Sequence, residues 1–485
     1  MDTPAIPAPR DEGEKEVLQQ LMSIRDHLQL RKLDRSTYVR TQDVMVLYEQ
    51  TIEQVKRLNE IRNGKTTEEN RVDRVVDSCF QLLSLFFMTI GRNNEAPAAY
   101  ALTSTIRRLL DHLTEADLFS AKDLESMSHT LDHLSEIVHS SPDTRSAPFL
   151  EALLANRIDR CRATLESLRR KNEEIAEPLR STAEKLVSML RQMAVINTRS
   201  KVCNKPAPVS PAQPANGTGQ FNSKEIHKFR SQLEEFGSQR VDGKFLDENQ
   251  NVLKGSEQVS GLLDRCLTYT TIVLERNGEF PEKWMPLYKT LVGIRNELDR
   301  LSLTQAWSLR ETDLYDYQRQ LDKIDESRID GNWIDEEGQP AELYVQRTLL
   351  YLIRRSYGYI YHLMISSEPV SEALLPIYNQ LQTLKRCLSE VKENGGVSTV
   401  RELYPYSMKL NSIDNMRVDG KFMVADDVPE GQGAVTELLS ECFDINYDLR
   451  LAAEAAAEAE KENSTSKPPD EPLTDTQAPD GKPET

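Results

Sequence analysis

The hexapeptide Arg-Val-Asp-Gly-Lys-Phe occurs at residues 240–245 and again, unchanged, at residues 417–422. A variant, Arg-Ile-Asp-Gly-Asn-Trp, occupies residues 328–333 between them. The three copies are separated by 88 and 89 residues, and this regular spacing indicates a duplicated structural unit. Chains built from such repeats usually present a surface to a partner rather than a single reaction centre.

Three apolar patterns with helical spacing surround these hexapeptides and also recur in the N-terminal half. They are named B, C and A in chain order, and in each pattern the apolar residues share one face of a helix. Pattern A usually ends on a cysteine. One occurrence of B, C and A consists of Leu291, Ile294 and Leu298, then Leu314, Leu321 and Ile324, then Val345, Leu349 and Leu352.

The order B–C–A repeats five times along the chain. The sequence therefore predicts an all-α fold, in which tandem three-helix repeats form an elongated helical-bundle array or a superhelix. Each repeat is near the size at which an isolated core is marginal, so neighbouring repeats are expected to share packing. The approximate repeats are residues 14–91, 96–171, 174–277, 282–366 and 370–460.

One repeat carries an insertion. The step from pattern B to pattern C is 47 residues in the third repeat, from Leu186 to Leu233, but 25 to 27 residues in the second, fourth and fifth. Residues 200–222 contain four prolines and an Asn-Gly-Thr-Gly string, which is typical of a flexible linker. The expected organisation is a disordered N-terminus (1–13), helical repeats (14–199), the linker (200–222), helical repeats with Asp-Gly loops (223–462) and a disordered acidic tail (463–485).

Composition narrows the class of protein. The 485 residues carry a net charge of −18, which argues against direct binding of nucleic acid or of a membrane surface. The longest apolar stretch, residues 79–90, is too short to span a bilayer, and no signal peptide is visible. The six cysteines lack a framework spacing, so reduced thiols in the cytoplasm or nucleus are expected.

Cysteine and histidine positions suggest packing rather than chemistry. Four cysteines occupy the same position of pattern A, where Leu352 stands in the fourth repeat, so they are expected to pack as small apolar side chains. His129 and His133 stand four apart on a predicted helix, a spacing that can hold a metal ion. Arg319 and Lys323 occupy the equivalent positions, which favours a solvated face, and no metal or cofactor site is predicted.

The Asp-Gly hexapeptides connect pattern C to pattern A in the last three repeats. Asp-Gly suits a tight turn, because glycine accepts a positive φ and the aspartate side chain can bond nearby backbone. Acidic residues follow each aromatic residue, but the order of a calcium-binding loop is absent. The candidate residues of the three loops are Arg240, Asp242 and Phe245; Arg328, Asp330 and Trp333; and Arg417, Asp419 and Phe422.

Two interpretations of the loops stay open. In the first, the aromatic side chain closes the end of a helical bundle while the arginine pairs with a nearby acid. In the second, the arginine and the aromatic residue anchor a partner protein, since such residues dominate interface hot spots. The first two repeats lack the hexapeptide, as a partner-binding edge confined to the second half of the chain would allow.

The sequence names no reaction. The Walker loop, Gly-x-Ser-x-Gly, His-Glu-x-x-His and the kinase motifs are missing. We therefore expect a non-enzymatic scaffold or regulatory adaptor with protein partners. The sequence does not determine its oligomeric state. The alternative is a small-ligand sensor or enzyme with a pocket between helices. Ser210, followed by Pro211 in the linker, is a candidate phosphorylation site.

The pattern C helix running into Arg-Ile/Val-Asp-Gly-x-Phe/Trp, with a preceding Pro-Leu-Tyr helix, resembles the fungal uncharacterised protein family 0662, whose members carry the domain of unknown function 2408. The resemblance extends over most of residues 14–450 outside the linker. It implies a fungal origin, and it supplies no catalytic residue and no cofactor.

Overall fold

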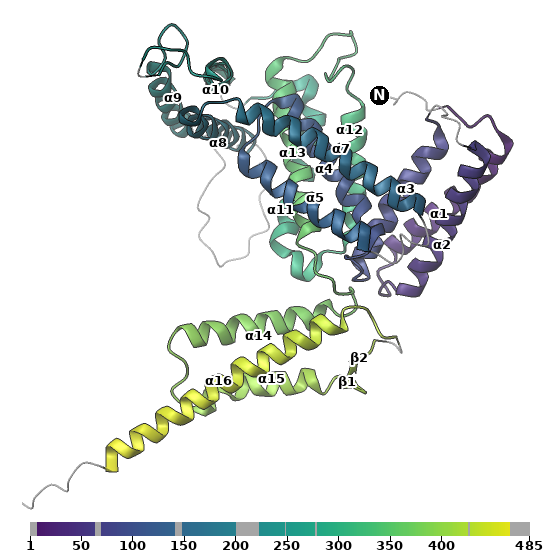
Figure 1. Ribbon diagram of the computed structural model, residues 1–485, viewed down its shortest axis with the longest axis vertical. Helices are drawn as coiled ribbons and strands as arrows, with labels where there is room; N and C mark the ends of the chain where they lie inside the picture. The colour runs from purple at the N-terminus through teal and green to yellow at the C-terminus, as the bar shows by residue number, and fades with distance from the viewer. Residues whose placement is uncertain are drawn as a thin grey trace, which may run out of the picture. The chain divides into compact units, whose positions relative to one another are not determined.

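The computed structural model describes most of the chain, and what it describes is almost entirely helical (Figure 1), which confirms the predicted all-α fold. The few strand residues lie in the Asp-Gly loops. The residues described are 7–63, 69–140, 148–199, 223–247, 249–276, 279–424 and 427–465, without the side chains of 199, 305–308 and 460–465.

Fifteen α-helices in this described part follow one another as five triplets, each in the predicted order B, C, A. They are α1 (Glu12–Leu33), α2 (Thr41–Arg62) and α3 (Arg71–Thr89); α4 (Ala99–Ala116), α5 (Ala121–Ser140) and α7 (Pro148–Glu173); α8 (Glu177–Arg199), α9 (Ser223–Ser238) and α10 (Ser256–Arg276); α11 (Met285–Ser308), α12 (Leu314–Glu326) and α13 (Leu343–Ile365); α14 (Leu375–Glu393), α15 (Tyr404–Asp414) and α16 (Gln432–Thr465). Short 3₁₀ helices precede four of them: η1 (Ala96–Ala98), η2 (Glu282–Trp284), η3 (Glu311–Asp313) and η4 (Val400–Leu403).

The chain forms two compact units. The large unit comprises residues 1–375 and 429–431 and contains the first four triplets. The C-terminal unit comprises residues 376–428 and 432–485 and contains the fifth. In the large unit, helix A of each triplet packs on helices B and C of the same triplet, and further contacts of α3 and α13 with α4 and of α3 with α12 join the triplets.

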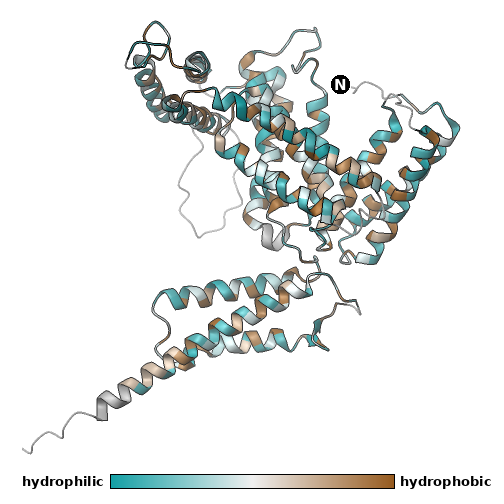
Figure 2. Ribbon diagram, viewed as in Figure 1, coloured by the Kyte–Doolittle hydropathy of each residue, from teal (hydrophilic) through white to brown (hydrophobic). Residues whose placement is uncertain are grey.

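Helix α3 lies at the centre of the large unit. Its N-terminus is fixed by a capping box. The side chain of Asn70 accepts a hydrogen bond from the backbone N–H of Val72, and the side chain of Asp73 accepts one from the backbone N–H of Asn70. Every residue from Ser78 to Thr89 is buried, so the apolar stretch noted in the sequence is a core helix covered on all sides. Figure 2 shows that hydrophobic and hydrophilic residues alternate along most of the helices. No described helix has the length and apolarity that a bilayer crossing requires.

The cysteines of helix A make one recurring contact with helix B. The Sγ–H of Cys79 donates to the carbonyl oxygen of Leu21 at 3.6 Å, and Cys442 donates to that of Leu381 at 3.5 Å. Each thiol thus satisfies its weak donor while it packs as a small apolar group, as predicted. The two remaining pairs are Cys161 with Thr103 (3.8 Å) and Cys266 with Leu186 (3.7 Å).

Candidate functional site

Each Asp-Gly pair forms the two-residue turn of a short β-hairpin. In the second loop Asp330 and Gly331 have φ angles of 49° and 78°, and the bridge Ile329–Asn332 closes the turn. Two successive residues with positive φ define a type I′ turn, for which Asp-Gly is a preferred sequence. The first and third loops repeat these angles and close through Val241–Lys244 and through β1 (Arg417–Val418) with β2 (Lys421–Phe422).

The aromatic residue of each loop is buried and tied to the start of helix A. Trp333 is 2% exposed, and its backbone N–H donates to Oε1 of Gln346 at 3.0 Å while its carbonyl accepts from Nε2 of the same side chain. Phe422 makes the same two bonds with Gln432. In the first loop the N–H of Phe245 donates to Oγ of Ser256 at 2.7 Å, so all three loops are fixed at the same point.

The arginine of each loop is engaged within the protein. Arg240 binds Asp264 at 2.8 Å. Arg328 binds Asp325 at 2.6 Å and Glu115 at 2.5 Å, and Arg417 pairs with Asp414.

Six of the nine predicted site residues therefore face inward, with the contacts that the first interpretation of the loops expects. Asp242, Asp330 and Asp419 lie exposed at the tips of the hairpins. Whether the loops bind a partner stays a prediction.

The acidic residues after the aromatic side chain build a second turn. Oδ1 of Asp335 accepts the N–H groups of Glu337 and Gln339 at 3.0 and 2.7 Å, and the side chain also pairs with Lys283. The Lys283 ammonium and these backbone donors lower the pKa of Asp335. Asp247 accepts two backbone N–H groups in the same way. These carboxylates are used for turn formation, which accounts for their repeated position.

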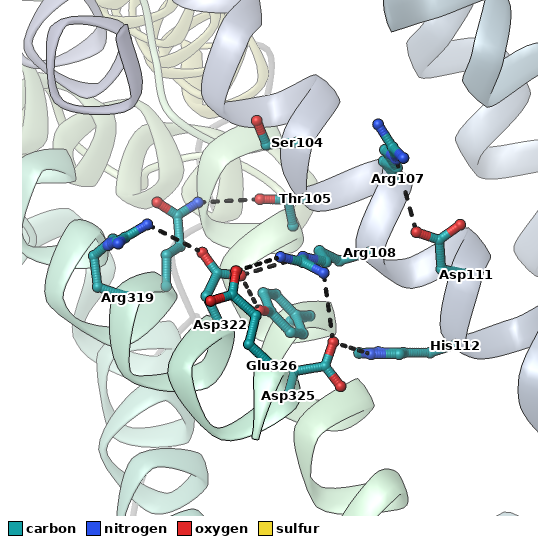
Figure 3. A network of polar contacts seen from close by, with 12 residues as sticks. Ser104, Thr105, Arg107, Arg108, Asp111, His112, Arg319, Asp322, Asp325 and Glu326 are labelled. Atoms are coloured by element: carbon teal, nitrogen blue, oxygen red, sulfur yellow. Dashed lines mark hydrogen bonds and ion pairs between the residues drawn. The ribbon is translucent and has the colours of Figure 1, made fainter. Parts of the chain in front are cut away.

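A partly buried charge network, shown in Figure 3, joins α4 to α12 and was not predicted. Arg108 of α4 lies 3.3 Å from Asp322, 3.6 Å from Asp325 and 3.6 Å from Glu326, all on α12. Nε2 of His112 lies 3.0 Å from Oδ2 of Asp325. These five residues couple two helices that are more than 200 positions apart in the sequence.

The network holds its carboxyl groups in different electrostatic environments. Burial raises the pKa of Asp322. Burial also opposes ionisation of Asp325, but the hydrogen bond with His112 and the charges of His112, Arg328 and Arg108 outweigh it and lower the pKa. Neither aspartate lines one of the two cavities described next, so the network stabilises the packing of α4 on α12.

A cavity of about 350 Å³ lies beside the second Asp-Gly loop. Its wall is formed by the end of α4, by α8 and α10, by residues 331–333 and by α13. An adjoining hollow of about 960 Å³ shares Arg191, Tyr351 and Arg354 with it. Four arginines contribute to the wall of the smaller cavity: Arg191, Arg265, Arg347 and Arg354.

Sequence reasoning anticipated a pocket between helices only in general terms and named none of these arginines. No local signal distinguishes them, because α13 also carries other polar residues such as Gln346, Thr348 and Arg355. His129 and His133 both lie exposed on α5, and the described residues contain no cluster of three potential metal ligands. Ser210, Cys203 and the whole of the predicted linker lie outside the described residues.

Two fungal proteins are similar to this chain over nearly its whole length. The chain is 36% identical to the "Cu(2+) suppressing and bleomycin sensitive protein 1" of Saccharomyces cerevisiae over 93% of this chain and 92% of that protein. It is also 36% identical to a CUB1 family protein of Schizosaccharomyces pombe over 92% of this chain and 94% of that protein. No solved structure is significantly similar.

A family model described as "Protein of unknown function (DUF2408)" matches residues 172–311 and 368–470, which is half of the chain. The matched segments contain the first and third Asp-Gly loops together with the helices that flank them. Together with two fungal relatives that align over nearly the whole length, this match shows that the chain belongs to the DUF2408 family.

Proposed function

We propose that this protein is a non-enzymatic adaptor that binds an α-helix of a partner protein through its C-terminal unit. The observation that supports this proposal is a row of exposed apolar side chains along one face of α15. Single exposed apolar residues are common on protein surfaces, but a contiguous row is typical of an interaction site.

The row begins in η4 and continues to the third Asp-Gly hairpin. Tyr404 and Met408 are four residues apart and therefore lie on one face of α15, and the exposed Val400 precedes them in η4. Met416 and Val418 continue the exposed apolar surface into the loop. Tyrosine and methionine are enriched in protein interfaces. The opposite face of the helix buries Leu403, Leu410 and Ile413 in the core of the C-terminal unit.

The equivalent face of the fourth triplet, in the large unit, supports this proposal. Tyr315 of α12 is the repeat equivalent of Tyr404, but it is only 5% exposed whereas Tyr404 is 65% exposed. The hydroxyl of Tyr315 lies 2.5 Å from Oγ of Ser78 on α3. Near the C-terminal end of α12, Glu326 pairs with Arg74 of α3 at 2.6 Å. In this triplet the face therefore receives a helix, and we infer that the exposed copy receives a helix from another protein.

The proposal also places the interaction in the cytoplasm or nucleus. Four cysteines use the S–H form as a hydrogen-bond donor to helix B, and this form persists where thiols are kept reduced.

The experiment compares three forms of the tagged full-length chain by quantitative affinity purification and mass spectrometry in a fungal host. They are the wild type, Tyr404→Ser/Met408→Ser, and a control, Leu303→Ser, which removes an even more exposed apolar residue from α11. Proteins that bind the apolar row should be lost from the double variant and retained by the control. A helical segment of such a protein, made as a peptide, should then bind the wild type but not the double variant.

The proposal fails if the double variant retains the same proteins as the wild type. It also fails if the captured proteins supply no helix that binds the purified chain. All substituted residues are exposed, so the three forms should have equal melting temperatures. Equal melting temperatures would show that a loss of binding is not caused by a loss of folding.

A further inference from the structure

We propose that the cavity between α8, α10 and α13 is a binding site for a small molecule that carries two or more phosphate groups. The site lies wholly within the large unit, and the proposal is independent of the apolar row on α15. It is argued from the arrangement of four arginines on the cavity wall.

Two of the arginines come from one face of α13. Arg347 and Arg354 are seven residues apart, which is two helical turns, with Tyr351 between them. All three line the cavity. Within the part of the chain that the structure describes, neither arginine makes an ion pair or a hydrogen bond. Their guanidinium groups therefore keep their donors available to a ligand.

A third guanidinium group is held in position by backbone. Arg265 of α10 donates from Nη2 to the carbonyl oxygen of Ala116 at 2.7 Å and from Nη1 to that of Asp117 at 3.5 Å. Carbonyl groups orient the side chain without neutralising its charge. Its Nε is buried and has no partner among the described residues. Arg191 of α8 is the fourth, and it pairs with Asp123.

Acidic residues on the cavity wall do not neutralise this cluster. Glu115 and Asp117 are the two carboxylates of the wall. Glu115 already pairs with Arg328 at 2.5 Å, and Asp117 lies 3.6 Å from Lys171. The cavity therefore has an excess of positive charge, although the net charge of the whole chain is −18. A local excess of this sign attracts anions despite the negative charge of the whole molecule.

The arginines also destabilise one another. Burial and the charge of Arg265 lower the pKa of Arg347. Burial and the charge of Arg191 lower the pKa of Arg354 to about 10. Half-buried guanidinium groups without counterions are unfavourable for folding, and an anion bound between them would offset this cost. Such an arrangement is expected of a site selected for binding rather than for stability.

Phosphate groups fit this wall better than other anions. A guanidinium group binds a phosphate through two parallel N–H···O bonds, and arginine is the preferred residue for this geometry. Four guanidinium groups can serve at least two phosphates. A cavity of about 350 Å³ is within the range of small-ligand sites.

The rest of the wall suits the remainder of such a ligand. Leu190, Leu343 and Leu350 contribute apolar surface to the wall, and Trp333 carries a buried indole N–H that has no acceptor among the described residues.

The test measures binding of inorganic pyrophosphate and of inositol hexakisphosphate to the full-length chain by isothermal titration calorimetry at near-physiological salt. The variant is Arg347→Met/Arg354→Met, which keeps the side-chain length and removes the charge. The matched control is Arg300→Met, which removes an exposed arginine of α11 that pairs with Glu297. Binding to the wild type and the control, and a loss of about tenfold or more in affinity in the double variant, is the expected result.

A second measurement separates a binding site from a structural role. Without ligand, the double variant should melt at a higher temperature than the wild type, because unfavourable charges are removed. With pyrophosphate, only the wild type and the control should gain stability. A lower melting temperature of the ligand-free variant together with unchanged binding would overturn the proposal.

Two further outcomes would also overturn it. One is a stabilisation by sulfate at equal ionic strength that matches the effect of pyrophosphate, since the site would then be a general anion site. The other is binding of a single-stranded RNA or a phosphopeptide that is tighter than that of both phosphate probes and lost in the double variant. The ligand would then be a macromolecule.

Discussion

The guanidinium group of Arg328 lies over the indole ring of Trp333, 5.3 Å from its centroid. The same arginine pairs with Asp325 and Glu115, so one side chain connects the second Asp-Gly loop to α12 and to the end of α4. The loop is thus part of the packing between triplets, and this relationship determines how its substitution should behave.

Arg328→Ala should lower the free energy of unfolding of the large unit by about 2 kcal/mol, because it removes one of the three basic side chains around the buried Asp325 carboxylate. Arg417→Ala should cost less than about 1 kcal/mol, because its ion pair with Asp414 is more exposed. All three tryptophans of the chain lie in the large unit. Urea unfolding is therefore followed by tryptophan fluorescence for Arg328→Ala and by circular dichroism for Arg417→Ala. Equal costs at the two positions would contradict this account.

The triple variant Arg240→Ala/Arg328→Ala/Arg417→Ala distinguishes the two interpretations of the loops. If the arginines serve packing, the triple variant should melt at a clearly lower temperature than the wild type. If it instead melts normally and loses co-purifying proteins, the arginines are partner anchors.

Thiol reactivity should separate Cys387 from the cysteines of helix A. Burial raises the pKa of Cys79 to about 12 and that of Cys442 to about 11, whereas Cys387 is exposed. At pH 8, iodoacetamide should label Cys387 about a hundredfold faster than these two, because only the thiolate reacts. Peptide mass spectrometry reads the labelling site by site. Rapid labelling of Cys79 in the folded chain would show that α3 does not pack on α1 as described.

Acid should destabilise the large unit partly through Asp325. The pKa of this carboxyl is lower in the folded state than in the unfolded state, so its contribution to stability is present above the unfolded pKa of about 3.9 and is lost as the pH falls through the folded pKa. Asp325→Asn should therefore be less stable than the wild type at pH 7 and should lose less stability on acidification. Denaturant unfolding at pH 7, 4 and 3 measures how much stability each protein loses on acidification. Asp132→Asn, at an exposed ion pair with Arg162, should follow the wild type.

The two repeat-equivalent tyrosines should respond oppositely to the same substitution. Tyr315→Ser removes a buried ring and its contact with Ser78, so it should cost about 3 kcal/mol or more of stability. Tyr404→Ser should change stability by less than about 0.5 kcal/mol. Thermal unfolding by circular dichroism compares the two. A large loss at Tyr404 would show that its face is covered within the chain.

The helical repeat could be predicted because its signals are local. The spacing of Leu21, Ile24 and Leu28 already specifies a helix face, and recurrence of the pattern supplied the triplets. The hairpins were foreseen as turns from the Asp-Gly pair alone, but the inward position of Phe422 depends on Gln432, which no local rule connects to it.

The charged network and the cavity could not be predicted for the same physical reason. Arg108 and Asp322 meet only after α4 and α12 have packed, and no sequence period relates them. Arg347 and Arg354 resemble any basic residues of a surface helix until α8 and α10 enclose them. Long-range pairing of charges follows from tertiary packing, not from periodicity.

The type I′ turns also determine how readily the three Asp-Gly pairs convert to isoaspartate. In a loose chain, the aspartate of an Asp-Gly pair cyclises readily onto the next backbone nitrogen and reopens as isoaspartate. Asp242, Asp330 and Asp419 are held in closed hairpins, where the fixed backbone opposes that cyclisation. Isoaspartate at one of the three positions in stored protein would therefore identify which hairpin opens first.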